Sequence, residues 1–170
     1  VMGDQNQIEQ VLLNLYINAW QAMPDGGNIF LETCNVEIDE TAAKPLDIQP
    51  GHYVRVSVAD TGVGIDNTVQ QKIFEPFFTT KEIGRGTGLG LASAFGIVKN
   101  HDGAINFESR LNEGSTFYIY LPASDEKVIK APTAVENLSK GSETILLVDD
   151  EKVILDVNKP MLQKLGYRVF

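Results

Sequence analysis

The first part of the chain carries apolar side chains at helical spacing. They fall on one face of a helix at positions Ile8, Val11, Leu12, Leu15, Ala19 and Ala22. Asp4 precedes them as a favourable N-cap residue, and Gln7 stands three residues later, as in a capping box. The stretch 24–27, with one proline and two glycines, breaks the pattern. The sequence therefore predicts a helix with one buried face.

Alternation of apolar and polar side chains predicts the first two strands. Residues 28–38 alternate, but the phase changes near Cys34, which indicates a β-bulge. Residues 54–60 alternate without interruption and end in Asp60. Between these segments, residues 39–52 contain two prolines and a glycine, and we expect them to form a loop.

Residues 61–122 contain two more helical patterns and a hairpin. A short helix is expected from Asp66 to Phe74, and a longer one over residues 89–100. His101 follows that helix and is predicted to be a helix-terminal residue rather than a catalytic group. Residues 104–109 and 115–121 alternate on either side of a turn at 112–114, which predicts a β-hairpin.

The rest of the chain has a different character. Residues 123–143 are mixed in charge and aperiodic, as expected of a linker. An apolar strand at 144–148, a helical pattern and the start of another strand then follow, as in an incomplete doubly wound α/β fold. We therefore expect three parts: a domain at 1–122, a linker at 123–143 and a domain fragment at 144–170.

Composition restricts the function. The 170 residues carry a net charge of −9, which disfavours a nucleic-acid partner because the phosphate backbone would be repelled. No apolar run approaches the roughly 20 residues that span a bilayer. The single cysteine, Cys34, fits a reducing compartment, and we expect a cytoplasmic location.

Two glycine clusters supply the candidate chemistry. They occupy residues 60–65 and 84–92, and the second runs into a predicted helix. Unshielded backbone amides and a helix N-terminus are suited to phosphate. Asn14 and Asn18 lie one turn apart in the first helix, where an amide oxygen can be offered to a hard cation such as Mg²⁺. The pattern predicts a nucleotide site with a lid, and Phe77 and Phe78 are interpreted as apolar latches of that lid.

Four segments in this order resemble the N, G1, F and G2 boxes of sensor histidine kinases. They are residues 14–19, 60–64, 74–78 and 86–91. The resemblance implies a two-layer α/β sandwich, the Bergerat-type ATP-binding fold, with helices on one mixed sheet and ATP between them. The segment from Thr144 resembles the start of a response-regulator receiver domain, which suggests a hybrid kinase.

The resemblance also implies roles for the residues that match the boxes. Asp60 would accept a hydrogen bond from the adenine amino group, and Asn18 would supply an oxygen to Mg²⁺. Asn14, Lys81 and Arg85 are the candidate catalytic residues, the last two as charge partners of the γ-phosphate. The other expected nucleotide contacts are Gly62, Gly64, Gly86, Thr87, Gly88, Leu89, Gly90 and Thr116.

The family pattern is not complete in this chain. Gln21 and Ala22 stand where many kinases have a basic residue and an aromatic residue. The phosphorylated histidine of the family lies on an upstream dimerisation domain, and neither His52 nor His101 can replace it. We therefore expect the partners to be those helices and a receiver domain, within a full-length homodimer. Any membrane anchor of the full-length protein would lie outside this sequence.

Two other classes of function are alternatives to a histidine kinase. The gyrase, chaperone and mismatch-repair ATPases share the implied fold, but they place a general-base glutamate where this chain has Asn14, which cannot take a proton. A non-catalytic nucleotide-binding interaction module remains open, because the acceptor histidine is absent from the chain.

Overall fold

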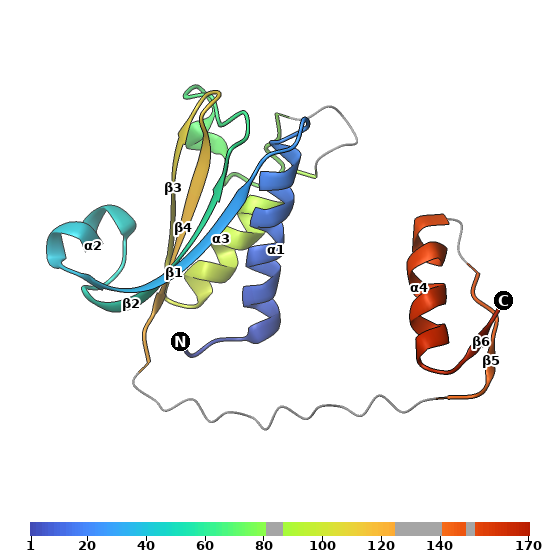
Figure 1. The fold of residues 1–170 in the computed structure, drawn as a ribbon. Coiled ribbons are helices and arrows are strands. Elements are labelled where there is room, and N and C mark those ends of the chain that lie inside the picture. The colour runs from blue at the N-terminus through green and yellow to red at the C-terminus, as the bar shows by residue number, and fades with distance from the viewer. Residues whose placement is uncertain (81–86, 125–140, 149–151) are drawn as a thin grey trace. The chain divides into compact units, whose positions relative to one another are not determined.

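The computed structural model describes residues 1–80, 87–124, 141–148 and 152–170. The chain forms two compact units, Val1–Asp125 and Glu126–Phe170. Unit 1 has two layers, a four-stranded sheet and a pair of helices that cover one of its faces (Figure 1). The predicted α/β sandwich is therefore confirmed for unit 1.

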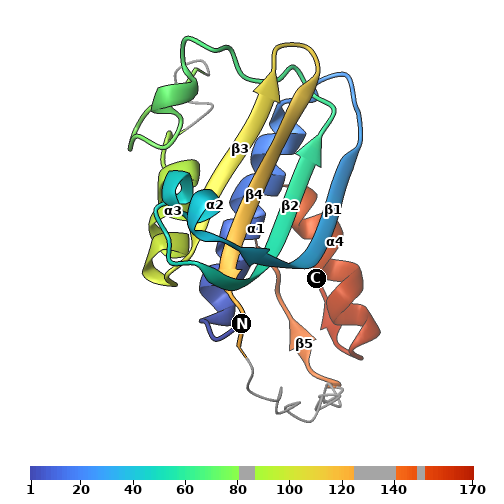
Figure 2. The ribbon, with the colours of Figure 1, turned by 90° about the vertical axis from the view of Figure 1, so that its left-hand side faces the viewer.

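The sheet of unit 1 has the strand order β1-β2-β4-β3 (Figure 2), with bounds Ile29–Ile38, Gly51–Asp60, Gly114–Pro122 and Ala104–Arg110 in that order. Every neighbouring pair is antiparallel, so the described sheet is not the mixed sheet that was expected. The hairpin of β3 and β4 was predicted correctly.

The bulge predicted near Cys34 is absent from β1. Pairing with β2 runs without interruption from Ile29 opposite Asp60 to Ile38 opposite Gly51. The alternation changes phase because β1 is an edge strand whose residues are mostly exposed, so neither face has to be uniformly apolar.

Helices α1 (Gln5–Gln21) and α3 (Gly90–Asn100) form the second layer. The predicted N-cap is present, because the Asp4 carboxylate accepts a hydrogen bond of 3.1 Å from the backbone N–H of Gln7. The two helices and the inner face of the sheet share one core, built from Val11, Leu15, Val58, Ile73, Ala94, Val98, Ile105, Phe117, Ile119 and Leu121. Both helix periodicities thus correspond to buried faces.

His101 joins the start of α1 to the end of α3. Its Nδ1 lies 2.8 Å from the carbonyl oxygen of Ile97, and its Nε2 accepts a hydrogen bond of 3.1 Å from the backbone N–H of Asp4. His101 is the C-cap residue of α3, as the sequence predicted. In a capping box, the side chain of Gln7 would accept a hydrogen bond from the N–H of Asp4. Here His101 accepts that hydrogen bond.

The predicted loop at 39–52 contains a helix, α2 (Glu40–Leu46), which lies on the side of the sheet away from α1 and α3 (Figures 1 and 2). The Asp39 carboxylate caps it by accepting from the N–H of Ala42 at 2.8 Å. Pro45 removes only one backbone donor, and the helix ends one residue later, so this proline is tolerated. Ala43 anchors α2 in a small second core with Ile38 and Tyr53.

The short helix expected from Asp66 to Phe74 is only a 3₁₀ turn, η1 (Gln70–Lys72). The Asp66 carboxylate binds the N–H and the hydroxyl of Thr68, at 2.8 and 2.6 Å. The Gln70 side chain donates to the carbonyl oxygens of Ile65 and Ser109. These side-chain bonds hold the segment as a turn in place of an α-helix.

Unit 2 contains β5 (Thr144–Ile145), α4 (Lys152–Lys164) and β6 (Arg168–Val169). The two short strands pair in parallel, so the described part is a strand–helix–strand unit of the expected order. Most of the predicted linker lies outside the described residues, at 125–140.

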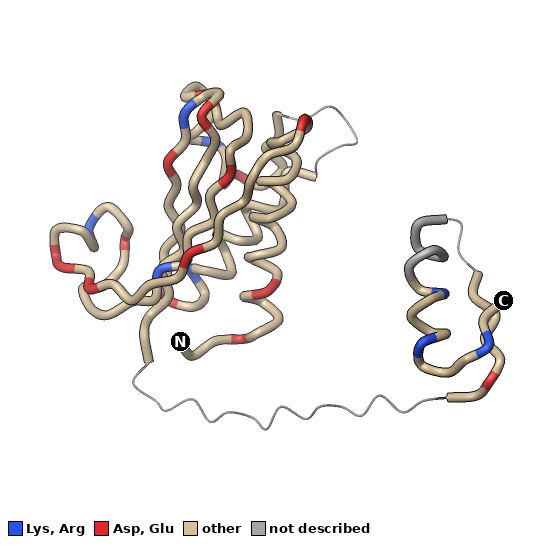
Figure 3. Tube along the Cα trace, viewed as in Figure 1, with Lys and Arg blue, Asp and Glu red and all other residues tan. Residues whose placement is uncertain are grey.

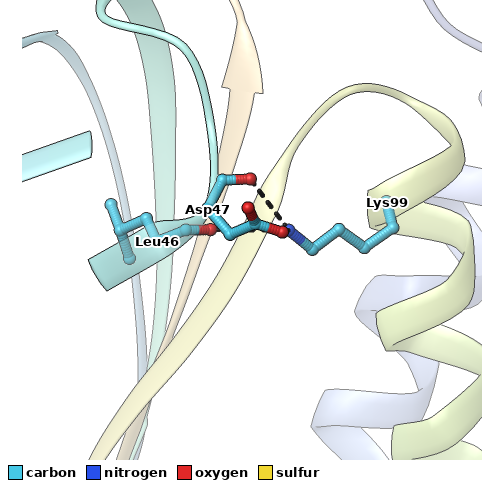
Figure 4. Close-up of polar contacts among 3 residues, drawn as sticks. All are labelled: Leu46, Asp47 and Lys99. Atoms are coloured by element: carbon cyan, nitrogen blue, oxygen red, sulfur yellow. Dashed lines mark hydrogen bonds and ion pairs between the residues drawn. The ribbon is translucent and has the colours of Figure 1, made fainter. Parts of the chain in front are cut away.

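Lys99 of α3 holds the end of α2 (Figure 4). Its ammonium group donates to the carbonyl oxygens of Leu46 and Asp47, at 3.4 and 3.1 Å, and lies 3.3 Å from an oxygen of the Asp47 carboxylate. Carbonyl groups at a helix C-terminus have no partner within the helix and interact favourably with a cation. Lys99 therefore ties the α2 insertion to the helical layer.

We predict that Lys99→Met lowers the unfolding free energy by about 1 kcal/mol, because the carbonyl groups lose a charged donor. Urea unfolding followed by circular dichroism would measure the change. The control is Asp47→Asn, which removes only the exposed ion pair and should cost under about 0.5 kcal/mol. Equal losses for the two variants would contradict the capping role.

Candidate nucleotide-binding site

A pocket of about 690 Å³ opens in unit 1 between the C-terminal part of α1, the start of α3 and one end of the sheet. Its size is that of a small-molecule site. A smaller hollow of about 460 Å³ lies beside α2 and is lined only by residues 40–50. None of the four motif segments contributes to that hollow, so we take the larger pocket as the candidate site.

Asp60 lies at the pocket wall, at the end of β2, and only 8 % of it is exposed. Its Oδ1 accepts a hydrogen bond of 2.8 Å from the N–H of Gly62. Burial raises the pKa of the carboxyl group, and hydrogen bonds from the backbone of Gly62 and Ser115 oppose that rise. The Asp60 carboxylate is therefore a buried hydrogen-bond acceptor at the pocket wall, and the backbone of Gly62 and Ser115 uses only part of its capacity to accept.

The loop after Asp60 is packed against two other backbone segments. A Cβ on Gly62 would collide with Ala22, and a Cβ on Gly64, where φ is +69°, would overlap the carbonyl oxygen of Arg110. The N–H of Val63 donates to the carbonyl oxygen of Ala22 at 3.0 Å. These glycines are therefore required for loop packing. Gly64 lines the pocket, whereas Gly62 does not.

Helix α1 places its two asparagines differently. Asn18 lines the pocket. Asn14 lies one turn earlier, beside the first residue of α3, where a Cβ on Gly90 would be 3.6 Å from its Oδ1. Asn14 and Asn18 thus occupy the junction of α1 and α3, with Asn18 on the pocket side.

The described residues that line the pocket include no positively charged side chain that could neutralise a polyanion. The charged lining residues are Asp60 and Asp66, both acidic. Figure 3 shows the charged positions along the chain, and helix α1 carries a single charged residue, Glu9. The described residues contain no cluster of three His, Cys, Asp or Glu side chains. Among the polar lining residues, Asn18 offers an amide oxygen, a ligand type that Mg²⁺ accepts.

The F segment is joined to the second glycine cluster through the backbone. The N–H of Phe77 donates to the carbonyl oxygen of Gly88 at 2.9 Å, and a Cβ on Gly88 would overlap Phe77. Phe78 packs on the core and lines the pocket, as a latch should. Phe77 is 74 % exposed, so its interpretation as an inward latch is wrong. The interpretation rested on the place of Phe77 between Pro76 and a Thr-Thr-Lys run, and that place does not fix the backbone conformation, which has a positive φ of 65° at Phe77.

The expected site residues fall into three groups. Six line the pocket: Asn18, Asp60, Gly64, Thr87, Gly88 and Gly90. Asn14, Gly62, Leu89 and Thr116 do not; Leu89 is the N-cap residue of α3, and its N–H donates to Thr87 Oγ1 at 3.3 Å. Lys81, Arg85 and Gly86 lie outside the described residues.

Thr116 was the wrong choice for the hydroxyl near the base. Ser115 and Phe117 line the pocket, and Thr116 lies between them on the other face of β4. In the sheet register, Ser115 stands opposite Asp60 and Thr116 opposite Ala59. Ser115 therefore holds the position that was assigned to Thr116.

Sequence reasoning also missed pocket residues outside the four motif segments. Among them are Leu111 at the hairpin turn, Phe117 on β4 and Gln21 at the end of α1. Side chains alternate between the two faces of a strand, so assigning either Ser115 or Phe117 to the pocket would have identified the other one as well. Leu111 carried no such signal, because only the fold brings the hairpin turn beside the Gly64 loop.

Comparison with known proteins agrees with this geometry. The model of the family described as histidine kinase-, DNA gyrase B-, and HSP90-like ATPase matches residues 3–125, and the chain belongs to this family. Unit 1 is thus an ATP-binding catalytic domain of the type found in histidine kinases.

Similar proteins are sensor kinases. Sensor kinase CckA of Brucella abortus is 44% identical over 99% of this chain and 19% of its own length. Sporulation kinase A of Bacillus subtilis is 43% identical over 72% of this chain and 18% of its own. The chain therefore spans less than a fifth of the length of these curated relatives.

Solved structures give the same fold. The catalytic domain of histidine kinase ThkA matches with a TM-score of 0.56 and 36% identity, over 72% of this chain and 70% of that one. The mycobacterial sensor histidine kinase MprB matches with a TM-score of 0.57 and 25% identity, over 72% and 74%. In the described part of the chain, no helix is long and apolar enough to cross a bilayer.

We predict that Asp60→Asn raises the melting temperature of the ligand-free chain at pH 7. The folded-state pKa of Asp60 is raised, so the neutral form is favoured by folding and the ionised form costs stability. The gain should disappear at pH values below the ordinary pKa of an aspartate, about 3.9, where this carboxyl group is neutral in both the folded and the unfolded chain.

The matched control is Asp66→Asn. Hydrogen bonds from Thr68 lower the pKa of Asp66, so its ionised form stabilises the fold above the unfolded-state pKa. This variant should therefore not raise the melting temperature at pH 7. Thermal unfolding at several pH values measures both, and a stability of Asp60→Asn equal to wild type at pH 7 would refute the argument.

Proposed function

We propose that this chain contains the catalytic ATP-binding domain of a two-component sensor histidine kinase, a protein-histidine kinase. It transfers the γ-phosphoryl group of ATP to a histidine on an upstream dimerisation domain. The observation that carries the proposal is the pocket in which buried Asp60 and Asn18 face one cavity at the start of α3. The family match and the names of the relatives support it.

Asp60 recognises the adenine. A buried carboxylate is an acceptor, and the amino group of adenine is the donor that it pairs with. Ala22, Val63 and Phe117 supply apolar wall beside it, which suits a flat base. Gln21 and Ala22 provide neither a cation nor an aromatic ring at this end of α1, so stacking and phosphate contact come from elsewhere.

Asn18 binds the cation, and the start of α3 receives the phosphates. A Mg²⁺ ion, when bound, neutralises charge between the β- and γ-phosphates. Gly88 and Gly90 bring backbone close to that position, and the N-terminus of α3 favours an anion. Gly86 and Thr87 belong to the same segment. Lys81 and Arg85 are proposed charge partners of the γ-phosphate.

Asn14 distinguishes the kinase from the related ATPases. An amide cannot accept a proton from water, so the residue one turn before Asn18 cannot act as a general base. We therefore expect slow hydrolysis and transfer to a protein histidine. A nucleotide-binding interaction module without transfer is the competing function.

The remaining partners follow from the second unit and from the family. The strand–helix–strand order of unit 2 supports a receiver domain beginning near Thr144. Asp149 and Asp150, its proposed acidic pair, lie outside the described residues. We propose relay to a receiver aspartate, a homodimeric full-length protein and a cytoplasmic location.

Asp60→Ala should weaken ATP binding at least tenfold by calorimetry, because a hydrogen bond to a charged group contributes about 1.5–3 kcal/mol. Circular dichroism should show an intact fold. Thr116→Ala is the control, since Thr116 lies on the opposite face of β4, and it should bind ATP as wild type does. Unchanged affinity in Asp60→Ala would remove Asp60 from the site.

The kinase function is tested with radiolabelled ATP. The chain alone should neither label itself nor turn ATP over rapidly, and addition of the dimerisation domain of the same protein should give a labelled histidine. Asn18→Ala should abolish this transfer and reduce the Mg²⁺ dependence of ATP affinity. ATP binding without transfer to that domain would favour the interaction module, and rapid turnover to ADP would favour an ATPase.

A further inference from the structure

Ser109 of β3 lies next to the end of the pocket that contains Asp60, where the adenine base is proposed to bind. In the sheet register, Ser109 is opposite Ser115, and Ser115 is opposite Asp60. The three residues therefore form a row across β3, β4 and β2 on the helix-covered face of the sheet. Ser115 and Asp60 line the pocket, whereas Ser109 does not.

The Ser109 hydroxyl has three polar neighbours. Its Oγ accepts a hydrogen bond of 2.8 Å from the N–H of Ile65, in the loop that follows Gly64. It lies 3.0 Å from the carbonyl oxygen of Gly114 and 3.0 Å from Ser115 Oγ. One hydroxyl group thus joins the Gly64 loop, the hairpin turn and a pocket residue.

The chemistry of these groups fixes the direction of each bond. A hydroxyl group has one proton to donate and two lone pairs to accept with. The N–H of Ile65 can only donate, and the carbonyl of Gly114 can only accept. All three contacts form together only if Ser109 donates to Gly114 and Ser115 donates to Ser109. The proton of Ser115 is then engaged away from the pocket.

We propose that Ser109 is a positioning residue for nucleotide selectivity, because it holds Ser115 as a hydrogen-bond acceptor beside Asp60. Two neighbouring acceptors match the amino group of adenine, which has two N–H donors. They oppose the carbonyl oxygen that 6-oxopurines carry at the same position, because that oxygen offers no proton. This inference rests on the proposed ATP-binding function.

The test compares the affinities of the full chain for ATP and for inosine triphosphate by calorimetry. In Ser109→Ala, the Ser115 hydroxyl is released and can donate to the 6-oxo group. The preference for ATP over inosine triphosphate should fall by about three- to tenfold, the range of one hydrogen bond. Ser109→Thr keeps the hydroxyl group and should keep the preference.

A double-mutant cycle separates positioning from loop packing. Ser115→Ala should also reduce the preference, and adding Ser109→Ala to it should change the preference no further, because Ser109 acts through Ser115. If Ser109→Ala does not fold, Ser109→Cys replaces it, since a thiol is a weak donor and a weak acceptor.

The outcomes distinguish this inference from the function beneath it. Equal weakening of both nucleotides in Ser109→Ala, or an unchanged preference, would overturn the positioning role while ATP binding stands. Failure of the wild-type chain to bind ATP, or unchanged affinity in Asp60→Ala, would overturn the proposed function itself.

Discussion

The close approach of two glycines to neighbouring backbone is the constraint on which the candidate site depends. Gly64 lies against the carbonyl oxygen of Arg110, and Gly114, with φ of +93°, lies against that of Asp60. Any side chain at either position would separate the Gly64 loop from the β3–β4 hairpin. Because the two are in contact, Ser115 and Asp60 lie side by side at one end of the pocket. Gly64, which belongs to the first of the two glycine clusters, therefore also shapes the pocket wall that contains Asp60.

The buried carboxyl group of Asp60, which lines the candidate site, lowers the stability of unit 1 when it is ionised. Burial raises the pKa of this carboxyl group, so its ionised form is disfavoured by folding, and the backbone bonds from Gly62 and Ser115 compensate only in part. A ligand donor that pairs with the carboxylate would supply the missing interaction. Affinity for an amino group and reduced stability of the empty domain are thus two effects of the same buried charge.

The helical layer connects the site to the rest of unit 1. Helix α1 presents Asn18 to the pocket at one end and receives His101 of α3 at the other. The start of α3 is held near the F segment by the backbone bond between Phe77 and Gly88. The proposed cation position on α1 and the proposed phosphate position at α3 therefore lie on two helices that share one core.

Sequence alone determined the features that depend on local chemistry. The periodicity and cap of α1, the α3 helix, the β3–β4 hairpin and the motif residues Asn18, Asp60 and Gly88 were all predicted, because spacing and turn residues act over a few positions. Tertiary structure decided the rest. A shift of one residue moves a strand side chain to the other face, so only the pairing of β4 with β2 could select Ser115 over Thr116. The α2 helix and the outward Phe77 likewise depend on contacts from distant segments, Lys99 for the former and Gly88 for the latter. Local structure depends on residues that are close in the sequence. The sheet face on which a residue lies and the residues that it contacts depend on chain segments far away in the sequence.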